Sequence, residues 1–176
     1  MENERQGVVT LKGNPVTLVG SGISVGQRAP DFTTVDNGLQ PVRFSDARGK
    51  VLILSSVPSL DTPVCDTETR RFNQEAAALP GVEIWTISMD LPFAQKRWCG
   101  AAGVTAVKTL SDFRDRSFGA AYGVQVKDGP LAGINARAVF VVGKDGSVTH
   151  AEYVKEITTE PNYDAALSAA RKAAGA

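Results

Sequence analysis

Short hydrophobic runs separated by polar turns predict a chain in which strands and helices alternate. The run Val-Leu-Ile-Leu within residues 51–57 contains no polar position. This is typical of a strand buried on both faces, so we predict a central strand there. Two more apolar segments predict strands over 82–88 and 107–110. Paired runs joined by turn residues predict hairpins over 8–19 and 138–154.

Helices are predicted between these strands from their start and stop signals. Thr62 is expected to cap a helix that begins at Pro63, because a proline at the first helical position loses no hydrogen bond. Pro80 and the glycine after it stop this helix. Further helices are predicted over 91–98 and 163–174.

The order of these elements predicts an α/β fold with a mixed central sheet and helices on both faces. The chain has 176 residues, of which 43% are hydrophobic, and no linker or repeat divides it. That length suits one hydrophobic core and is short for two. We therefore expect a single domain over 1–176, with an N-terminal hairpin extension over 1–20.

Cys65 is the residue with the most distinctive chemical setting. It falls in the first turn of the predicted helix, among backbone N–H groups without intrahelical partners and at the positive end of the helix dipole. Such a position favours thiolate over thiol. The Thr62 hydroxyl, three residues upstream, is expected to donate to the sulfur or to accept an acidic proton, and Pro58 to shield the site from water. The alternative is a buried, inert cysteine.

The spacing Pro58-x-x-x-Thr62-x-x-Cys65 resembles the active-site signature of the peroxiredoxins. The longer string Asp-Thr-Pro-Val-Cys-Asp-Thr at 61–67 is similar to that of bacterial thiol peroxidases. Segments 12–16, 26–32 and 156–163 also fit this group, so the resemblance extends over nearly the whole chain. It implies a thioredoxin-like fold and the reduction of alkyl, lipid and hydrogen peroxides.

The resemblance also implies a reaction cycle with two cysteines. Cys65 would be oxidised to a sulfenic acid, Cys99 would resolve it as an intramolecular disulfide, and thioredoxin would reduce that disulfide. From the sequence alone, Cys99 could equally be a small apolar residue within its helix. Since a disulfide needs Cα atoms within about 7 Å, the first turn around Cys65, the segment around Cys99, or both are expected to unfold locally after oxidation. Gly100 and Gly103 make the segment around Cys99 the softer one.

Arg137, at the start of the strand expected from residue 138, is the candidate electrostatic catalyst. Complete ionisation of a thiol with a pKa of about 8.5 gains only about thirtyfold in rate at pH 7, so the transition state needs stabilisation as well. A guanidinium offers several donors at once, and the resemblance places a matching arginine beside the cysteine. The alternative is a solvated charge at a strand end. Asp66 and Glu68 are interpreted as helix-stabilising acids.

Charge and residue counts narrow the possible partners. Lys and Arg total 19, as do Asp and Glu, which argues against nucleic acid or an anionic membrane surface as partner. The two cysteines fit neither a C-x-x-C nor a zinc-ligand spacing and the chain has one histidine, so we expect no metal. The glycines of 20–26 do not make a dinucleotide loop, so we expect no cofactor. No apolar run approaches about 20 residues and residues 1–5 resemble no signal peptide, so we expect a cytoplasmic protein without a membrane partner.

Three functions from different classes are compatible with the sequence. The first is a thiol-dependent peroxidase, which the resemblance favours and which it further implies to be a homodimer. The second is a redox sensor that passes oxidation to a partner protein. The third is a structural thioredoxin-like module whose cysteines are inert.

Overall fold

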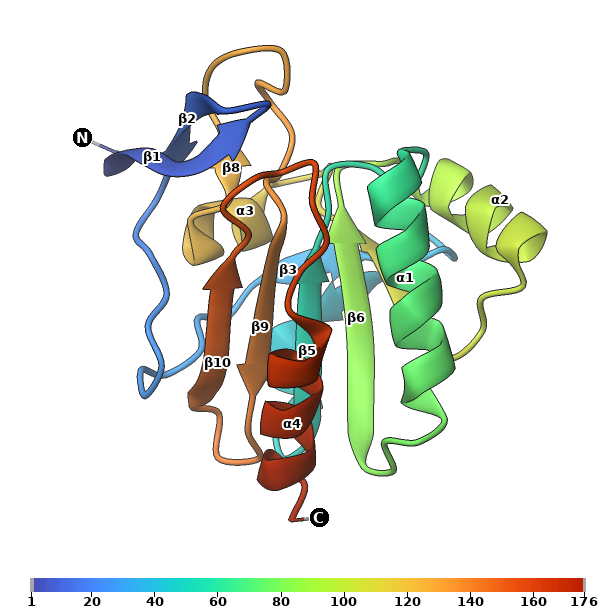
Figure 1. Cartoon of the computed structure of the whole chain (residues 1–176). Helices are drawn as coiled ribbons and strands as arrows, with labels where there is room; N and C mark the ends of the chain where they lie inside the picture. The colour runs from blue at the N-terminus through green and yellow to red at the C-terminus, as the bar shows by residue number, and fades with distance from the viewer. Residues whose placement is uncertain (1, 176) are drawn as a thin grey trace.

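A seven-stranded mixed sheet organises the structure (Figure 1). The computed structural model describes residues 2–175. The three central strands run parallel to one another, and the remaining neighbours pair antiparallel. In their order across the sheet the strands are β10 (Val148–Tyr153), β9 (Ala138–Val142), β5 (Val51–Ser56), β6 (Val82–Ser88), β7 (Lys108–Ser111), β3 (Thr33–Val35) and β4 (Pro41–Arg43).

Helices cover both faces of this sheet, which confirms the predicted α/β architecture (Figure 1). Helices α1 (Pro63–Ala76), α2 (Pro92–Ala102) and α4 (Tyr163–Ala173) share one hydrophobic core on the front face. Helix α3 (Ser117–Tyr122) packs on the other face in an aromatic core, beside the short 3-10 helix η1 (Phe44–Ala47). None of the helices within residues 2–175 is both long and apolar enough to span a bilayer.

Strand β5 is the central strand that the apolar run predicts. All six of its residues are buried, with Val51 and Ile53 in the core under α1 and Leu52 and Leu54 in the aromatic core. A strand covered on both faces has no solvent-facing position, which explains why the run lacks alternation. Its carboxyl end leads directly into Pro58 and the start of α1.

The N-terminal hairpin forms a separate small sheet at one end of the large one (Figure 1). Strands β1 (Glu4–Leu11) and β2 (Asn14–Val19) pair antiparallel, and β8 (Gln125–Val126) joins the edge of β2. Lys12 and Gly13, with φ of 49° and 81°, form the two-residue turn. Positive φ at both positions is what the tightest hairpin turns require. The hairpin prediction is confirmed, although β1 begins four residues before the predicted strand.

Several short elements were beyond the reach of the sequence pattern, namely β3, β4, β8 and α3. Helix α3 has no capping side chain at Arg116; instead, the carboxylate of Asp112 accepts from the backbone N–H groups of Phe118 and Gly119. Asp115 also accepts from the Ser117 N–H (3.1 Å), but a helix of six residues is too short for a hydrophobic period to reveal it. Among the predicted helices, α1 ends at residue 76 instead of 78, whereas α2 continues to residue 102 instead of ending at 98.

Glu156 fastens the N-terminal hairpin to the segment that follows β10. One carboxylate oxygen accepts from the Gly13 N–H (2.8 Å) and the Thr10 hydroxyl (3.0 Å), and the other accepts from the Thr158 N–H (3.0 Å). These bonds hold the pKa of Glu156 down at about 2, and Thr158 and Gly13 are the main contributors. The hairpin turn is thus clasped to the segment 156–158.

We predict that Glu156→Gln loosens this clasp, because a neutral amide is a weaker acceptor for the Gly13 N–H than a carboxylate. Loss of about 1 kcal/mol corresponds to an amide exchange rate at Gly13 about fivefold faster. Hydrogen exchange followed by NMR measures the exchange rate of the Gly13 amide. Glu160→Gln is the matched control, since that carboxylate accepts from Tyr163 instead of the hairpin. Equal Gly13 exchange in the two variants would contradict the clasp.

Candidate active site

Cys65 is the third residue of α1 and its side chain is fully buried. Thr62 has the extended backbone of an N-cap (φ −97°, ψ 147°), and Pro63 is the first helical residue, as predicted. The Thr62 side chain, however, differs from the expectation. Its hydroxyl donates to the carbonyl oxygen of Ser59 (2.8 Å) instead of the Cys65 sulfur, because the turn before the helix brings that carbonyl within reach.

Arg137 lies beside Cys65 and is only 2% exposed, which is the opposite of a solvated strand-end charge. It immediately precedes β9, and β9 pairs with β5 so that Ala138 lies opposite Ser56. This register brings the guanidinium to the end of β5, where α1 begins. Its Nη2 donates to Cys65 Sγ (3.3 Å), Nη1 to Glu68 Oε2 (2.6 Å) and Nε to the Ile157 carbonyl oxygen (2.9 Å).

Glu68 contacts Arg137 within the site, which its interpretation as only a helix-stabilising acid missed. Its side chain is fully buried, pairs with Arg137 and accepts from the Ser55 hydroxyl (2.8 Å). Burial raises the pKa of Glu68 to about 7, against the opposing effects of Arg137 and Ser55. The available signal was its position three residues after Cys65, which places both on one helix face.

The charge of Arg137 is secured by its two acidic neighbours. Although burial opposes it, Glu68 and Cys65 together raise the pKa of Arg137 above its ordinary value. The guanidinium therefore stays positive and is held in one orientation by three acceptors. Fixed N–H groups of this kind stabilise negative charge on a neighbouring sulfur or oxygen.

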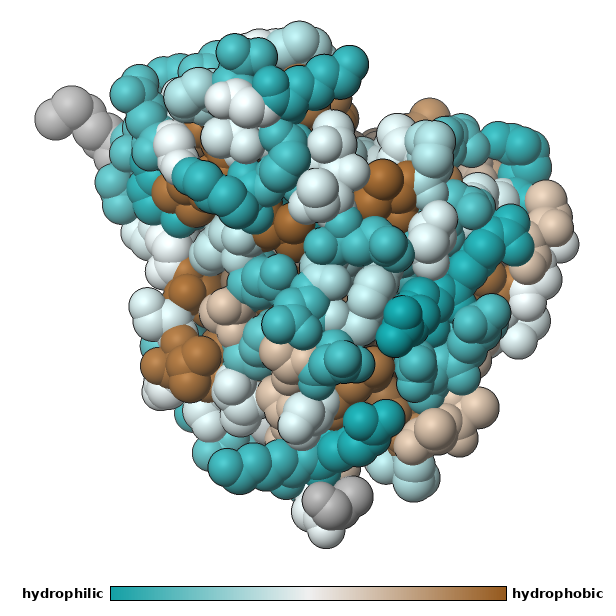
Figure 2. Space-filling model, in the orientation of Figure 1, coloured by the Kyte–Doolittle hydropathy of each residue, from teal (hydrophilic) through white to brown (hydrophobic). Residues whose placement is uncertain are grey.

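A cavity of about 210 Å³ opens beside this cluster. It is mostly apolar, and the N-terminal sheet contributes to its wall. Figure 2 shows apolar residues in the furrow between that sheet and the first turn of α1. Val64 lines the cavity, whereas Leu60 is 2% exposed and belongs to the core. The lining residues are Leu11, Pro58, Thr62, Pro63, Val64, Leu131, Arg137, Ile157 and Thr158.

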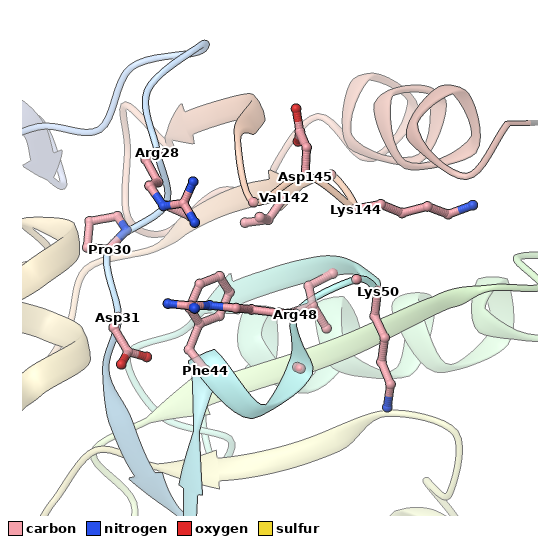
Figure 3. Close-up of a pocket in the computed structure, with 15 residues that line it drawn as sticks. Arg28, Pro30, Asp31, Phe44, Arg48, Lys50, Val142, Lys144 and Asp145 are labelled. Atoms are coloured by element: carbon pink, nitrogen blue, oxygen red, sulfur yellow. The ribbon is translucent and has the colours of Figure 1, made fainter.

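A larger cavity, of about 430 Å³, lies at the opposite end of β5 (Figure 3). Figure 3 shows Arg28 and Arg48 pointing into it, while Lys50 and Lys144 point away. Neither cysteine lines it. Of the groups identified above, Pro58, Thr62 and Arg137 line the smaller cavity, whereas Cys65 lies behind Arg137 and is fully buried.

Cys99 lies in the last turns of α2 and is partly buried. Its sulfur is 3.3 Å from the Thr109 hydroxyl, and it borders a cleft of about 390 Å³ that shares no lining residue with the cavity next to Arg137. Both cysteines are free thiols in this structure. The structure thus brings Pro58, Thr62, Cys65 and Arg137 together and leaves Cys99 at a separate cleft. Among the described residues, no three His, Cys, Asp or Glu side chains gather as metal ligands would.

Comparison with known proteins identifies the family. The Redoxin family model matches residues 24–167. The thiol peroxidase of Halalkalibacterium halodurans is 54% identical over 94% of this chain and 98% of its own, and that of Bacillus subtilis is 55% identical over 93% and 96%. The crystal structure of a peroxiredoxin-like protein from Aquifex aeolicus, 46% identical, superposes with a TM-score of 0.90 over 98% of each chain. These likenesses confirm the thioredoxin-like fold. The chain therefore belongs to the redoxin family and, within it, to the thiol peroxidase group of peroxiredoxin enzymes.

Proposed function

We propose that this enzyme reduces alkyl and lipid hydroperoxides, and hydrogen peroxide, with Cys65 as the peroxidatic residue. The observation that carries the proposal is the Arg137 guanidinium, which donates to Cys65 Sγ while it also lines an apolar cavity. The fixed donors of Arg137 thus connect the buried sulfur to a space that suits a peroxide with an apolar substituent. The cycle is proposed to run in the cytoplasm, where dithiol reductants keep catalytic cysteines reduced.

In the first step, the Cys65 thiolate attacks the terminal oxygen of the peroxide. The S–O bond forms as the O–O bond breaks, and the leaving oxygen takes a proton to become water or an alcohol. A guanidinium has five N–H donors, and three are used by Cys65, Glu68 and Ile157, which leaves two for the peroxide oxygens. Pro58 and Thr62 line the same cavity and are proposed to exclude water and to contact the peroxide.

In the second step, Cys99 resolves the sulfenic acid: its sulfur bonds to Cys65 and a water molecule leaves. A thioredoxin-type dithiol then returns two electrons and two protons to the disulfide. Because the cysteines lie in separate helices, Cys65 buried beside Arg137 and Cys99 at a separate cleft, α1 or α2 has to unwind locally before the sulfurs meet. The whole chain is proposed to act as one domain, since both cysteines contact the same hydrophobic core.

Glu68 is proposed to position Arg137. The Nη1 to Oε2 contact, with the Ser55 hydroxyl on the other carboxylate oxygen, fixes the plane of the guanidinium relative to Cys65. A carboxyl group with a pKa near 7 also carries only part of a negative charge at neutral pH. It therefore orients the arginine without cancelling its charge completely.

The proposed homodimer is supported by exposed apolar side chains at the start of α2. Leu91 and Phe93 are 50% and 67% exposed, whereas most of the other aromatic residues are buried in the cores. Neighbouring exposed apolar residues often mark a protein contact. This pair is the surface that we propose a second copy covers.

The peroxidatic and resolving roles predict different defects in the two cysteine variants. Cys65→Ser is expected to abolish peroxide reduction because the nucleophile is lost. Cys99→Ser is expected to keep one turnover at the wild-type rate but to lose cycling with thioredoxin. Stopped-flow measurement with cumene hydroperoxide and with hydrogen peroxide tests both roles, and the apolar cavity predicts the faster reaction for cumene hydroperoxide. An active Cys65→Ser protein would refute the proposal.

The raised pKa of Glu68 predicts a pH-dependent stability that Glu68→Gln removes. The folded protein holds a proton up to pH 7 that the unfolded chain releases near pH 4.5, so the contribution is present at low pH and is lost as the pH rises through 7. Between pH 4.5 and 8, the free energy of unfolding of the reduced wild type should fall by about 3 kcal/mol relative to the variant.

Urea denaturation at the two pH values measures this difference. The control is Glu75→Gln, which removes a carboxylate that pairs with Arg71 farther along the same helix. Parallel pH profiles for wild type and Glu68→Gln would show that the buried carboxyl group does not titrate in this range.

Phe93→Ser is predicted to weaken the dimer because it removes the most exposed aromatic side chain at the proposed contact. Val25→Ser is the matched control, since Val25 is 64% exposed but lies outside α2. Sedimentation velocity at micromolar concentration should give a dimer for wild type and for the control, and a larger monomer fraction for Phe93→Ser. A monomeric wild type, or a fully dimeric Phe93→Ser protein, would exclude this contact.

A further inference from the structure

Three hydroxyl-bearing residues lie side by side across the sheet under α1 and α2. Ser55 on β5 is the register partner of Thr86 on β6, which is in turn the partner of Thr109 on β7. All three are buried. Ser55 and Thr109 are about 10 Å apart, because neighbouring strands lie about 4.8 Å apart. We call these three residues the hydroxyl row. Its Ser55 end lies near Cys65 and its Thr109 end lies near Cys99.

At one end of the row, Ser55 donates to Glu68, which holds Arg137 against Cys65. At the other end, Thr109 contacts the sulfur of Cys99. Between them, Thr86 Oγ1 is buried and has no hydrogen-bond partner among the described residues. The row thus contains one hydroxyl bound to Cys99 and a neighbouring hydroxyl, on the same face, that is bound to nothing.

The Thr109 hydroxyl connects Cys99 to the loop at residue 37. It donates to Asn37 Oδ1 (3.2 Å), so its oxygen is free to accept the S–H of Cys99 at 3.3 Å. Thr109 is 3% exposed, and its rotation is limited by the strand on which it lies. The contact therefore fixes the Cys99 side chain in the reduced, helical state.

Helix α2 is held to the sheet through its first half and to α1 through its second, where the Trp98 indole donates to Asp66 Oδ1 (2.9 Å) and Arg70 Nη1 donates to the Ala102 carbonyl oxygen (3.2 Å). In its first half, the buried amide of Gln95 donates to the Ser88 hydroxyl (3.0 Å) and to the Leu110 carbonyl oxygen (2.9 Å). Its last turn ends at Gly103, which has a φ of 67°, and Gly100 follows Cys99 directly. For the turn that carries Cys99, the contact with Thr109 is the side-chain bond that joins the cysteine to the sheet.

We propose that Thr109 is a positioning residue that holds Cys99 in the folded helix and must release it before the Cys65–Cys99 disulfide forms. This rests on the proposed two-cysteine cycle. In the resolving step, the S–O bond of the sulfenic acid breaks, the S–S bond forms, and the Cys99 proton leaves with the hydroxyl group as water. The Cys99–Thr109 contact exists only before that step, so it stabilises the reduced protein relative to the disulfide.

Thr109→Val should therefore favour the disulfide. Loss of one modest hydrogen bond corresponds to a three- to fivefold increase in the equilibrium constant for disulfide formation. At 29.6 mV for each tenfold change, the reduction potential falls by about 15–20 mV. The resolution rate should rise by a similar factor, whereas the rate of Cys65 oxidation by peroxide should not change. A purely structural defect would not separate these rates.

Thr86→Val is the matched control, because it makes the same substitution on the neighbouring strand and removes an unpartnered hydroxyl. Thr109→Ser keeps the hydroxyl and should restore wild-type values. Asn37 accepts from the Thr109 hydroxyl and so helps to orient it toward Cys99. Asn37→Ala should therefore shift the potential in the same direction as Thr109→Val, but by less. Because Asn37 is partly exposed, this variant replaces Thr109→Val in the test if Thr109→Val does not fold. Redox titration in dithiothreitol buffers, with thiols counted by gel shift, gives the potential, and stopped-flow tryptophan fluorescence gives the resolution rate.

The outcomes separate this inference from the function on which it rests. If peroxide produces no Cys65–Cys99 disulfide in the wild type, the proposed cycle fails. If the disulfide forms but Thr109→Val and Thr86→Val share one potential and one resolution rate, the cycle stands and the role of Thr109 is overturned. A lower potential and faster resolution in Thr109→Val alone would support it.

Discussion

The buried charge of Arg137 is the constraint on which the rest of the site depends. A guanidinium enclosed by protein is stable only where acceptors satisfy it, because desolvation of an unpaired charge costs several kcal/mol. Its acceptors come from two elements: Cys65 and Glu68 from α1, and the Ile157 carbonyl from the segment after β10. The fold has to bring these segments to the end of β5. The antiparallel pairing of β9 with β5 achieves this. It places Ala138 opposite Ser56, so Arg137, which precedes Ala138, lies next to the first turn of α1.

The same burial creates a competition for one positive charge. An anionic Cys65 and an anionic Glu68 both face Arg137, and a fully ionised cluster would carry a net negative charge in a poorly solvated place. The protein relieves this excess at Glu68, whose pKa burial raises to about 7. In the proposed reaction, Arg137 can then donate to the sulfur and to the incoming peroxide, while the hydrogen bond with Glu68 still holds its orientation. The Arg137–Glu68 pair thus sets both the orientation of the guanidinium and the net charge of the cluster.

Local signals in the sequence were sufficient for the elements that carry Cys65. Strand β5, the Thr62 cap and the Pro63 start depend on neighbouring residues, and the structure has them within one or two positions of the prediction. Glu68 was misread because its partner lies 69 residues away and no local pattern reveals that both are buried. The Thr62 hydroxyl was assigned to the sulfur because sequence spacing cannot show a competing carbonyl at Ser59. Cys99 was placed in the correct helix, but its contact with Thr109 depends on how α2 packs on β7.

The separation of the two cysteines follows from conflicting requirements. In the proposed cycle, Cys65 needs a dry, enclosed position so that Arg137 acts at full strength, whereas reduction by another protein needs a sulfur that can be reached. A helix anchored along its whole length would protect Cys99 but would prevent it from reaching Cys65. Gln95 fixes the first half of α2 to the sheet, whereas Trp98 and Ala102 tie its second half to α1. In the proposed cycle, unwinding of the turn with Cys99 breaks the contacts with α1 and leaves the Gln95 bonds in place. In the proposed cycle, this division of contacts reconciles an enclosed Cys65 with a disulfide that a reductant can reach.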